Sequence, residues 1–449
     1  MKHLFSRLSP AQKIILSFLL VIFCGSLLLS LPWVQTASSQ AGYLDHLFTA
    51  VSMVCVTGLF TRSVVDTYNV WGQLLCMLLI QIGGLGILTF IGFFTMESRK
   101  KLSLKDRRIL RDSFSYGHNR TLGQFVRSIF ITTFTIEGLG ALLLMIRFIP
   151  KFGLGKGIFN SIFLAVSAFC NAGFDNFGND SLLGLQTDVL VNITLALLII
   201  TGGLGFMVWF DLATKLGGKQ KGLHFHTKVV LLLTAGLLVF GTVMSLWTEY
   251  NNPGTIGNLS FGDKLLVSFF QTVSMRTAGF ASIDYTAARP VTLFIYLLQM
   301  FLGGAPGGTA GGLKITTFLV LLLFARKEIL SLPHTNMGRR TLAPQLVQKA
   351  FGVTVIFQMT FLLGLLALGL VTDSSHRFIY LIFETVSALA TVGVTANITT
   401  SLNTAGMVVI MLLMFIGRVG PLTLMVSLNH YQPKKATTLH YSKADIMIG

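Results

Sequence analysis

The sequence predicts an all-α polytopic membrane protein with four tandem helix–pore-hairpin–helix repeats around a central pseudo-fourfold pore. Of its 449 residues, 53% are hydrophobic and 11% are charged, which is too apolar for an ordinary soluble domain. The basic residues gather in alternate segments between the apolar stretches. A short motif that ends in a glycine occurs four times. Together these observations indicate several membrane crossings arranged as repeats.

The repeated motif begins with Phe, continues through Val-Ser and a small or polar run, and ends at a glycine. The four copies span residues 48–58, 163–173, 270–279 and 383–393, so their glycines are 115, 106 and 114 residues apart. The Phe-x-x-Val-Ser part has helical spacing but is too short to cross a bilayer. Each copy is therefore predicted to be a short helix followed by a re-entrant turn.

Four such turns could together form a cation site. Glycine gives each turn a backbone freedom that a residue with a Cβ lacks. Arranged around an axis, the turns could aim carbonyl oxygens inward and replace the water around a dehydrated cation. An ordinary C-cap at the end of a buried helix is the alternative for any single copy. Four copies in the same hydropathic context favour the ring.

The apolar stretches that flank the hairpins supply the crossings. Repeat 1 covers residues 1–98. The later ranges each begin with a linker: residues 99–214 hold repeat 2, residues 215–328 hold repeat 3, and residues 329–449 hold repeat 4 and the C-terminal tail. The predicted pairs of helices are residues 13–31 and 70–95 in repeat 1 and residues 125–149 and 189–212 in repeat 2. They are residues 229–247 and 291–325 in repeat 3 and residues 351–371 and 405–428 in repeat 4. Because a hairpin enters and leaves on one side, each repeat crosses the membrane twice.

The distribution of charge predicts the orientation. The net charge of +17 comes from basic clusters in every second segment between crossings, and the other segments carry most of the acids. The clusters lie within residues 2–13, 99–111, 215–228, 326–349 and 434–443. By the positive-inside rule, both termini are cytoplasmic in a multi-pass protein of the cell (plasma) membrane. This pattern disfavours a nucleic-acid partner, and the basic linkers could instead contact anionic membrane lipid.

The second helix of repeat 3 contains Gly303-Gly-Ala-Pro-Gly-Gly-Thr-Ala-Gly-Gly-Leu-Lys314, which cannot form a continuous helix. It does not match a phosphate-binding loop, because Leu313 separates Gly312 from Lys314. A broken helix at membrane depth must line a cavity. The segment is therefore predicted to be a flexible gate beneath the ring, with a passive kink as the alternative. The predicted gate residues are Gly303, Gly304, Pro306, Gly307, Gly308, Thr309, Gly311, Gly312, Lys314 and Arg418.

Charged residues inside the apolar stretches are costly and usually functional. Arg418 could face the pore, where it would repel cations or donate hydrogen bonds to the carbonyls of the glycine-rich loop. Glu137 could pair with a cation or with freed backbone groups, and Arg276 and Glu384 are expected to brace their hairpins. For Gly83/Gly84 and Gly202/Gly203, helix packing and helix bending remain equal explanations.

Two acids, Asp175 and Asp284, are expected to flank the outer mouth and to raise the local cation concentration. The sequence contains no nucleophile–base pair, metal-ligand cluster or nucleotide-binding motif, so it does not predict an enzyme. An ion-coupled symporter of a small organic solute is the alternative function. That alternative expects inverted repeats, whereas these repeats run parallel.

The four repeats, the glycine of each hairpin and the GGAPGGTAGG segment resemble the Trk/Ktr/HKT potassium transporter superfamily. Eight crossings without an extra N-terminal helix pair are most similar to the KtrB membrane subunits. The resemblance implies Na⁺-dependent inward conduction of K⁺ without an organic cofactor. It also implies a homodimer on a cytosolic nucleotide-binding ring of the KtrA type, which the basic linkers and the C-terminal tail would contact.

The resemblance also assigns residues. It maps the family's intramembrane gate onto residues 303–312 and its barrier arginine onto Arg418. No copy has the long Thr-Val-Gly-Tyr-Gly filter of tetrameric potassium channels, so four short, nonidentical turns should give fewer strong sites. The implied K⁺ filter residues are Val56, Thr57, Gly58, Asn171, Ala172, Gly173, Thr277, Ala278, Gly279, Thr391, Val392 and Gly393.

Overall fold

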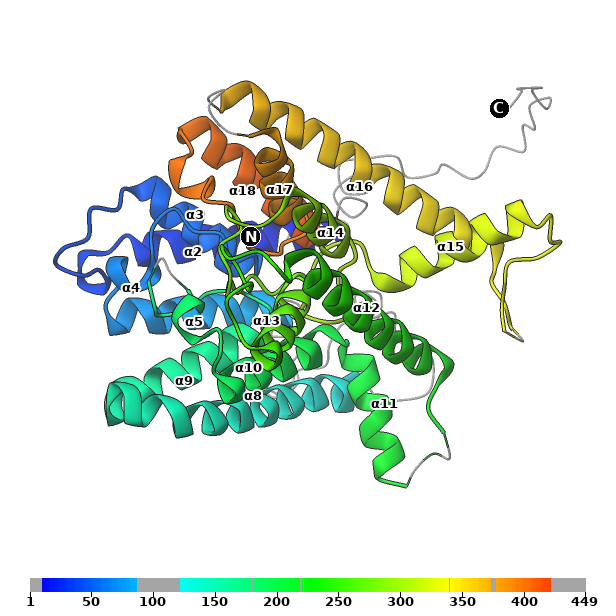
Figure 1. Ribbon diagram of the computed structural model, residues 1–449, viewed down its shortest axis with the longest axis horizontal. Helices are drawn as coiled ribbons and strands as arrows, with labels where there is room; N and C mark the ends of the chain where they lie inside the picture. Colours follow the sequence, from blue (N-terminus) through cyan, green and yellow to red (C-terminus); the bar gives the residue numbers. More distant parts are fainter. Residues whose placement is uncertain are drawn as a thin grey trace, which may run out of the picture.

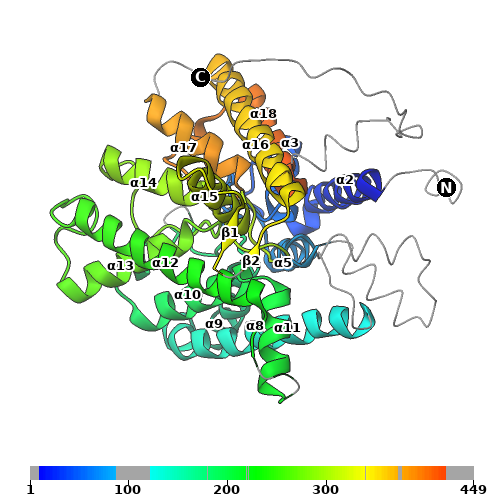
Figure 2. The same cartoon turned by 90° about the vertical axis from the view of Figure 1, so that its right-hand side faces the viewer.

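The computed structural model describes residues 10–86, 122–178, 181–218, 220, 222–338, 340–372 and 377–420. These residues are mostly helical, and the helices surround a centre where several irregular segments meet (Figures 1 and 2). The part corresponding to repeat 1 contains α2 (Pro10–Leu29), η1 (Pro32–Val34), α3 (Tyr43–Val54), α4 (Val64–Thr67) and α5 (Val70–Leu85). Repeat 2 contains α8 (Leu122–Phe152), α9 (Leu154–Phe169), η2 (Leu183–Leu185), α10 (Val189–Gly203) and α11 (Phe206–Leu216).

The second half follows a similar order. Repeat 3 contains α12 (Phe225–Glu249), α13 (Phe261–Ser274), α14 (Pro290–Phe301) and α15 (Ile315–Ile329). Repeat 4 contains α16 (Pro344–Val371), α17 (Phe378–Leu389), η3 (Thr399–Ser401) and α18 (Thr404–Val419). A small antiparallel hairpin of β1 (Asn336–Met337) and β2 (Arg340–Thr341) joins α15 to α16, with Asn336 opposite Thr341.

Local chemistry sets where several helices begin. Asn69, Asp188, Ser260 and Asn403 precede α5, α10, α13 and α18, and each side chain accepts a hydrogen bond from an N–H of the first turn. Such caps satisfy amide groups that have no partner within the helix. Three of these caps fix the start of a second helix of a repeat at or next to the residue that the hydropathy pattern predicts.

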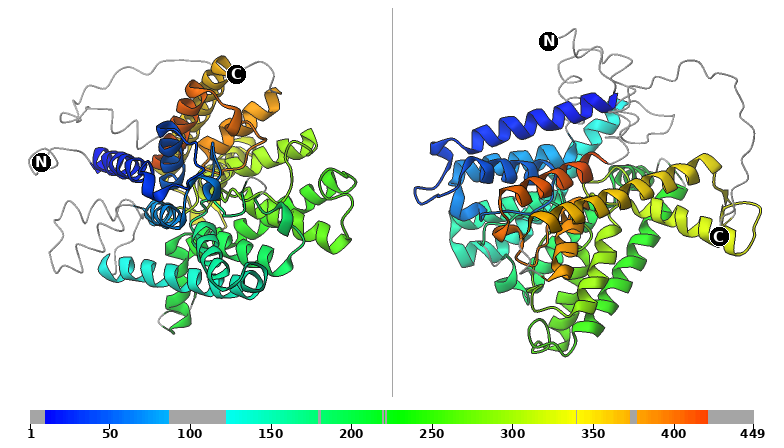
Figure 3. Two further views of the ribbon diagram at one scale, coloured as in Figure 1. Left: turned by 90° about the vertical axis from the view of Figure 1, so that its left-hand side faces the viewer. Right: turned by 90° about the horizontal axis from the view of Figure 1, so that it is seen from above.

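The short helices α3, α9, α13 and α17 form the centre of the molecule. In α3, eight of twelve residues are buried, including Phe48 and Ser52. Each short helix packs against the first helix of its own repeat and against a second helix from another part of the chain. These second contacts run α5 to α9, α10 to α13, α14 to α17 and α18 to α3. The contacts thus form a closed cycle. Figure 3 shows the chain from two further sides, with its colours running along the sequence.

The outer helices expose apolar side chains. Leu20 on α2, Ile146 on α8 and Leu363 on α16 are 55%, 64% and 67% exposed. An apolar exterior of this kind is stable in lipid rather than in water. Among the described helices, α2, α8, α12 and α16 are long and apolar enough to span a membrane, and the bent pair α10–α11 would make a fifth span.

The predicted second helices differ most from the structure. The continuous helix expected over 189–212 is wrong, because the chain breaks between Gly203 and Phe206 and bends by 98°. The predicted break within 291–325 is observed, since α14 ends at Phe301 and α15 begins at Ile315. In the described residues α5 ends at Leu85 and α18 at Val419; the rest of the predicted ranges 70–95 and 405–428 lies outside the description. All four second helices therefore end at or beside a glycine-containing segment.

Candidate functional site

The four glycine turns share one strained backbone conformation. The residue two before each glycine has a positive φ although it carries a side chain: 56° at Val56, 58° at Asn171, 69° at Thr277 and 51° at Thr391. The glycines themselves have φ between 72° and 103°. Positive φ is uncommon for residues with a Cβ, above all for β-branched ones, and it persists only where surrounding contacts enforce it. Four repetitions at the same position indicate that this turn serves a function.

The turns meet one another through their backbones. A Cβ placed on Gly58, Gly173 or Gly279 would lie 2.7 Å from a carbonyl oxygen of another turn, and one placed on Gly393 would overlap such an oxygen. The oxygens met in this way belong, in order, to Ala172, Ala278, Val392 and Thr57. Each glycine therefore faces the carbonyl that precedes the next glycine, and the fourth turn closes onto the first. All twelve residues predicted for the filter lie in this ring of turns.

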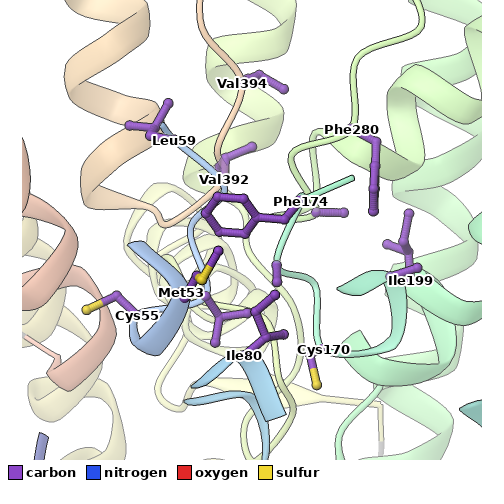
Figure 4. Packing of buried hydrophobic residues seen from close by; sticks show 14 of the residues in the cluster. Met53, Cys55, Leu59, Ile80, Cys170, Phe174, Ile199, Phe280, Val392 and Val394 are labelled. Carbon is purple, nitrogen blue, oxygen red and sulfur yellow. The ribbon is translucent and has the colours of Figure 1, made fainter. Parts of the chain in front are cut away.

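Apolar side chains and helix ends surround the ring. The residues that follow the glycines, namely Leu59, Phe174, Phe280 and Val394, are at most 1% exposed. Figure 4 shows these four residues around the centre together with Val392, Cys55 and Cys170. The helices α3, α9, α13 and α17 all end just before the turns, so their C-terminal ends approach the ring. A helix C-terminus carries a partial negative charge that stabilises a nearby cation.

The serine of each Val-Ser pair holds its turn in place, a role that the sequence analysis missed. The hydroxyls of Ser52, Ser167 and Ser387 accept from Gly58 N, Phe174 N and Gly393 N at 3.1, 2.9 and 3.0 Å. Ser274 instead donates to the carbonyl of Phe280 at 2.6 Å. Serine precedes glycine by six residues in the first, second and fourth copies of the motif and by five residues in the third copy. This invariant serine, at nearly constant spacing, was the signal available in the sequence.

The glycine-rich segment lies directly against the ring. Thr309 Oγ1 donates to the carbonyl of Phe169 at 3.1 Å, and Phe169 ends the short helix α9. A Cβ on Gly311 would overlap the hydroxyl of Thr391, and one on Gly312 would lie 3.5 Å from the carbonyl of Ala390. The structure thus brings together the loop and two of the turns. The neck of the loop closes where Gly303 N donates to Leu313 O at 3.0 Å.

Two cations hold the loop. The guanidinium of Arg418 donates to the carbonyls of Thr309 and Gly83, and also to Gly84 O at 3.2 Å. Lys314 Nζ donates to Ala310 O at 2.7 Å. Arg418 therefore joins α18, the loop and the C-terminal end of α5. Close packing explains the glycine at 83, because a Cβ there would overlap the carbonyl of Val54.

The remaining charged residues lie around the ring rather than in it. Glu384 accepts from the hydroxyls of Thr395, at 2.6 Å, and Thr399, which braces the fourth hairpin. Glu137 accepts from Gln81 Nε2 at 3.2 Å, so its partner is an amide rather than a cation. Arg276 Nη2 reaches only the hydroxyl of Thr234, at 3.5 Å, among the described hydrogen bonds.

Asp175 and Asp284 lie in the loops that follow the second and third turns. Asp175 accepts from Ser181 Oγ at 2.6 Å and from Phe177 N at 2.9 Å. Burial raises the pKa of the Asp175 carboxyl to about 6, against the opposite effect of these two hydrogen bonds. Within the described part of the chain, no three His, Cys, Asp or Glu side chains gather as a metal site. The oxygens that the four glycines face are main-chain carbonyls.

Comparisons with known proteins agree over nearly the whole chain. The family model described as "TrkH: Cation transport protein" matches residues 7–438. The Ktr system potassium uptake protein B of Bacillus subtilis is 38% identical, with 99% of this chain and 97% of that protein covered. The potassium/sodium uptake protein NtpJ of Enterococcus hirae is also 38% identical, over 100% and 99% of the two chains. The crystal structure of the potassium transporter TrkH from Vibrio parahaemolyticus has a similar fold, with a TM-score of 0.73 at 17% identity and coverage of 93% and 84%.

Proposed function

Because this chain belongs to the TrkH family of cation transport proteins, we propose that it is a potassium uptake subunit that conducts K⁺ inward through the ring of four glycine turns. Its family is one of transporters and not of enzymes, and its apolar helices make it a multi-pass membrane protein. The Bacillus subtilis, Enterococcus hirae and Vibrio alginolyticus relatives are all named as potassium uptake or potassium/sodium uptake proteins.

One observation carries this proposal: each glycine of the ring faces the carbonyl before the next glycine. In the proposed filter these carbonyls replace the hydration shell of K⁺, and four parallel repeats form a pseudo-fourfold pore around it. The C-terminal ends of the four short helices add partial negative charge on the same cation. A side chain on any of the glycines would push a carbonyl away from the ring, which explains the repeated motif.

The glycine-rich loop is the proposed gate. It lies against two of the turns, and the cationic groups of Arg418 and Lys314 bind its carbonyls. In this position the loop obstructs the inner side of the ring, and two positive charges oppose the passage of a cation. Inward flow then requires the loop to move away from the turns.

Several finer features remain part of the proposal. Both termini are cytoplasmic, in line with the basic segments. Two subunits pair on a cytosolic nucleotide-binding ring of the KtrA type, which is consistent with relatives that are named as parts of a Ktr system. The proposal includes transport that depends on Na⁺, and the Enterococcus hirae relative is named as a potassium/sodium uptake protein. Membership of a cation transport family disfavours the alternative, a symporter of a small organic solute.

Ion flux into proteoliposomes tests the proposal. The purified full-length protein is reconstituted, and uptake of K⁺, Rb⁺ and Na⁺ is measured separately down equal inward gradients. K⁺ and Rb⁺ are expected to enter faster than Na⁺, because the carbonyl ring replaces the hydration of the larger ions. Equal entry of the three ions would contradict the filter, and no entry of any ion would contradict the transport function.

A further inference from the structure

The bend between α10 and α11 is held by specific contacts. Gly205 adopts φ +88°, a conformation that an L side chain rarely adopts. Trp209, one turn into α11, donates its indole Nε1–H to the carbonyl of Thr201 at 2.8 Å. Carbonyls in the last turn of a helix lack partners within the helix, so this indole satisfies one that the break leaves free. The bend is therefore a stable element of the fold.

The glycine-rich loop is seated in this bend through three backbone hydrogen bonds. Two of them run from the loop: Ala305 N donates to Gly203 O at 2.9 Å, and Thr309 N donates to Gly202 O at 3.2 Å. The third runs in the opposite direction, from Phe206 N to Gly307 O at 3.0 Å. These bonds satisfy backbone groups that both broken helices leave unpaired.

The seat is also sterically tight. A Cβ on Gly205 would lie 2.7 Å from the carbonyl of Pro306, and one on Gly304 would lie 2.7 Å from the carbonyl of Gly203. Distances below 3.0 Å are not found for real Cβ contacts, so either side chain would displace the backbone opposite. The loop and the bend fit together only when residues 205 and 304 are both glycine.

The middle of α11 is fastened to the start of α12, because Asp211 is the sixth of the eleven residues of the helix. Asp211 is 5% exposed, and its carboxylate accepts from His224 N at 2.9 Å, from the His224 ring and from the amide of Gln220. The first residue of α12, Phe225, lies 4.7 Å beneath the guanidinium of Arg340 on β2. In the proposed orientation the C-terminal end of α11 faces the cytosol. Figures 1 and 2 show α11 projecting from the helices beside it.

An apolar cluster couples the bend and α11 to α12, the loop and α15. Leu204 and Val208 pack with Val230 of α12, Ala305 of the loop and Ile315 of α15. A helix of eleven residues is stiff and about 16 Å long. Movement at Asp211, halfway along the helix, is thus transmitted to the seat at Gly205, the N-cap of α11.

We propose that α11 is the lever of the gate: it holds the loop closed at the bend, and Asp211 is a positioning residue that fixes the lever in the closed state. This inference rests on the proposed function, because it requires the loop to be the gate. A partner that separates His224 from Asp211 would tilt α11 and draw the loop away from the ring. Opening then needs no contact between that partner and the pore.

Two substitutions, one at the N-cap of α11 and one at its middle, test the lever in the full-length protein in proteoliposomes. Gly205→Ala should raise K⁺ uptake about tenfold, the factor that corresponds to about 1.4 kcal/mol, because its Cβ displaces the loop at Pro306. Asp211→Asn keeps the size of the side chain but loses hydrogen-bond acceptor capacity. It should therefore also raise K⁺ uptake. Gly153→Ala is the matched control, since Gly153 has φ +82° and no atom within 4 Å of its Cβ position. Its uptake should equal that of the wild type.

A spectroscopic measurement separates movement of α11 from general damage. In a background where the exposed Trp33, Trp71 and Trp247 are replaced by Phe, Trp209 is the remaining tryptophan. Asp211→Asn should then shift its fluorescence emission to longer wavelength, with the K⁺/Na⁺ uptake ratio unchanged because the ring is untouched. Asp211→Asn alone carries the test if Gly205→Ala does not fold.

The possible results distinguish the two proposals. Wild-type uptake and emission in Asp211→Asn, with K⁺ uptake intact in the parent protein, would overturn the lever and leave the potassium function standing. A drop in the K⁺/Na⁺ ratio would also overturn the lever, because it would place the effect in the ring. Absence of K⁺ uptake in the parent protein would overturn the proposed function and the lever together.

Discussion

The substitution Gly279→Ser is a sharp test of the ring. Gly279 has φ +80°, and its Cβ would lie 2.7 Å from Val392 O, 3.0 Å from Gly173 Cα and 3.3 Å from Thr57 O. The left-handed conformation alone costs a residue with a Cβ about 1–2 kcal/mol. The contact with Val392 O must in addition move a carbonyl of the ring by several tenths of an ångström. If that displacement removes about 1.4 kcal/mol of the preference for K⁺, the K⁺/Na⁺ uptake ratio falls about tenfold.

The control for this prediction is Gly153→Ser. Gly153 has φ +82°, so it carries the same backbone cost, but nothing lies within 4 Å of its Cβ position. Both variants should unfold at lower temperature than the wild type, whereas only Gly279→Ser should lose selectivity. The assay is parallel uptake of K⁺ and Na⁺ into proteoliposomes, with thermal unfolding followed in detergent. An unchanged ratio in a folded Gly279→Ser protein would refute the argument that the glycine keeps the carbonyl in place.

Three further predictions concern the gate, the support of the turns and the outer mouth. Deletion of residues 307–311 removes Thr309 and its contact with Arg418, so it should raise K⁺ flux; wild-type flux in a folded deletion protein would remove the gating proposal. Ser387→Ala leaves the buried Gly393 N–H without its acceptor, at a cost of about 1–3 kcal/mol. It should lower K⁺ uptake severalfold, whereas the control Ser17→Ala in α2 should leave K⁺ uptake unchanged. Asp175 carries its charge above its pKa of about 6 and loses it below, so uptake should fall as the external pH is lowered from about 7 to about 5. The Asp175→Asn variant should show low uptake at both values, and an unaltered pH profile in that variant would exclude Asp175 as the titrating group.

Local signals in the sequence predicted the starts of the second helices well. The ranges that begin at residues 70 and 189 begin there in the structure, because Asn69 and Asp188 cap them through their own neighbouring amides. The ends of these helices were predicted poorly. The range 189–212 was predicted as one helix, yet it breaks at Gly203 because the loop at 305–309, about a hundred residues later, supplies the hydrogen bonds that replace the lost helical ones. The hydropathy of residues 189–212 does not indicate a hydrogen-bond partner so distant in the sequence.

The candidate site divides in the same way. The sequence by itself determined that four turns with a glycine exist, that the third repeat contains a segment that cannot stay helical, and that Arg418 stands within an apolar stretch, because these are properties of residue type and spacing. Only the tertiary structure decided that each glycine faces the carbonyl preceding the next, that the serines hold the turns, and that Arg418 reaches Gly83, 335 residues away. Contacts between residues so far apart depend on how the helices pack, and no short stretch of sequence encodes that arrangement.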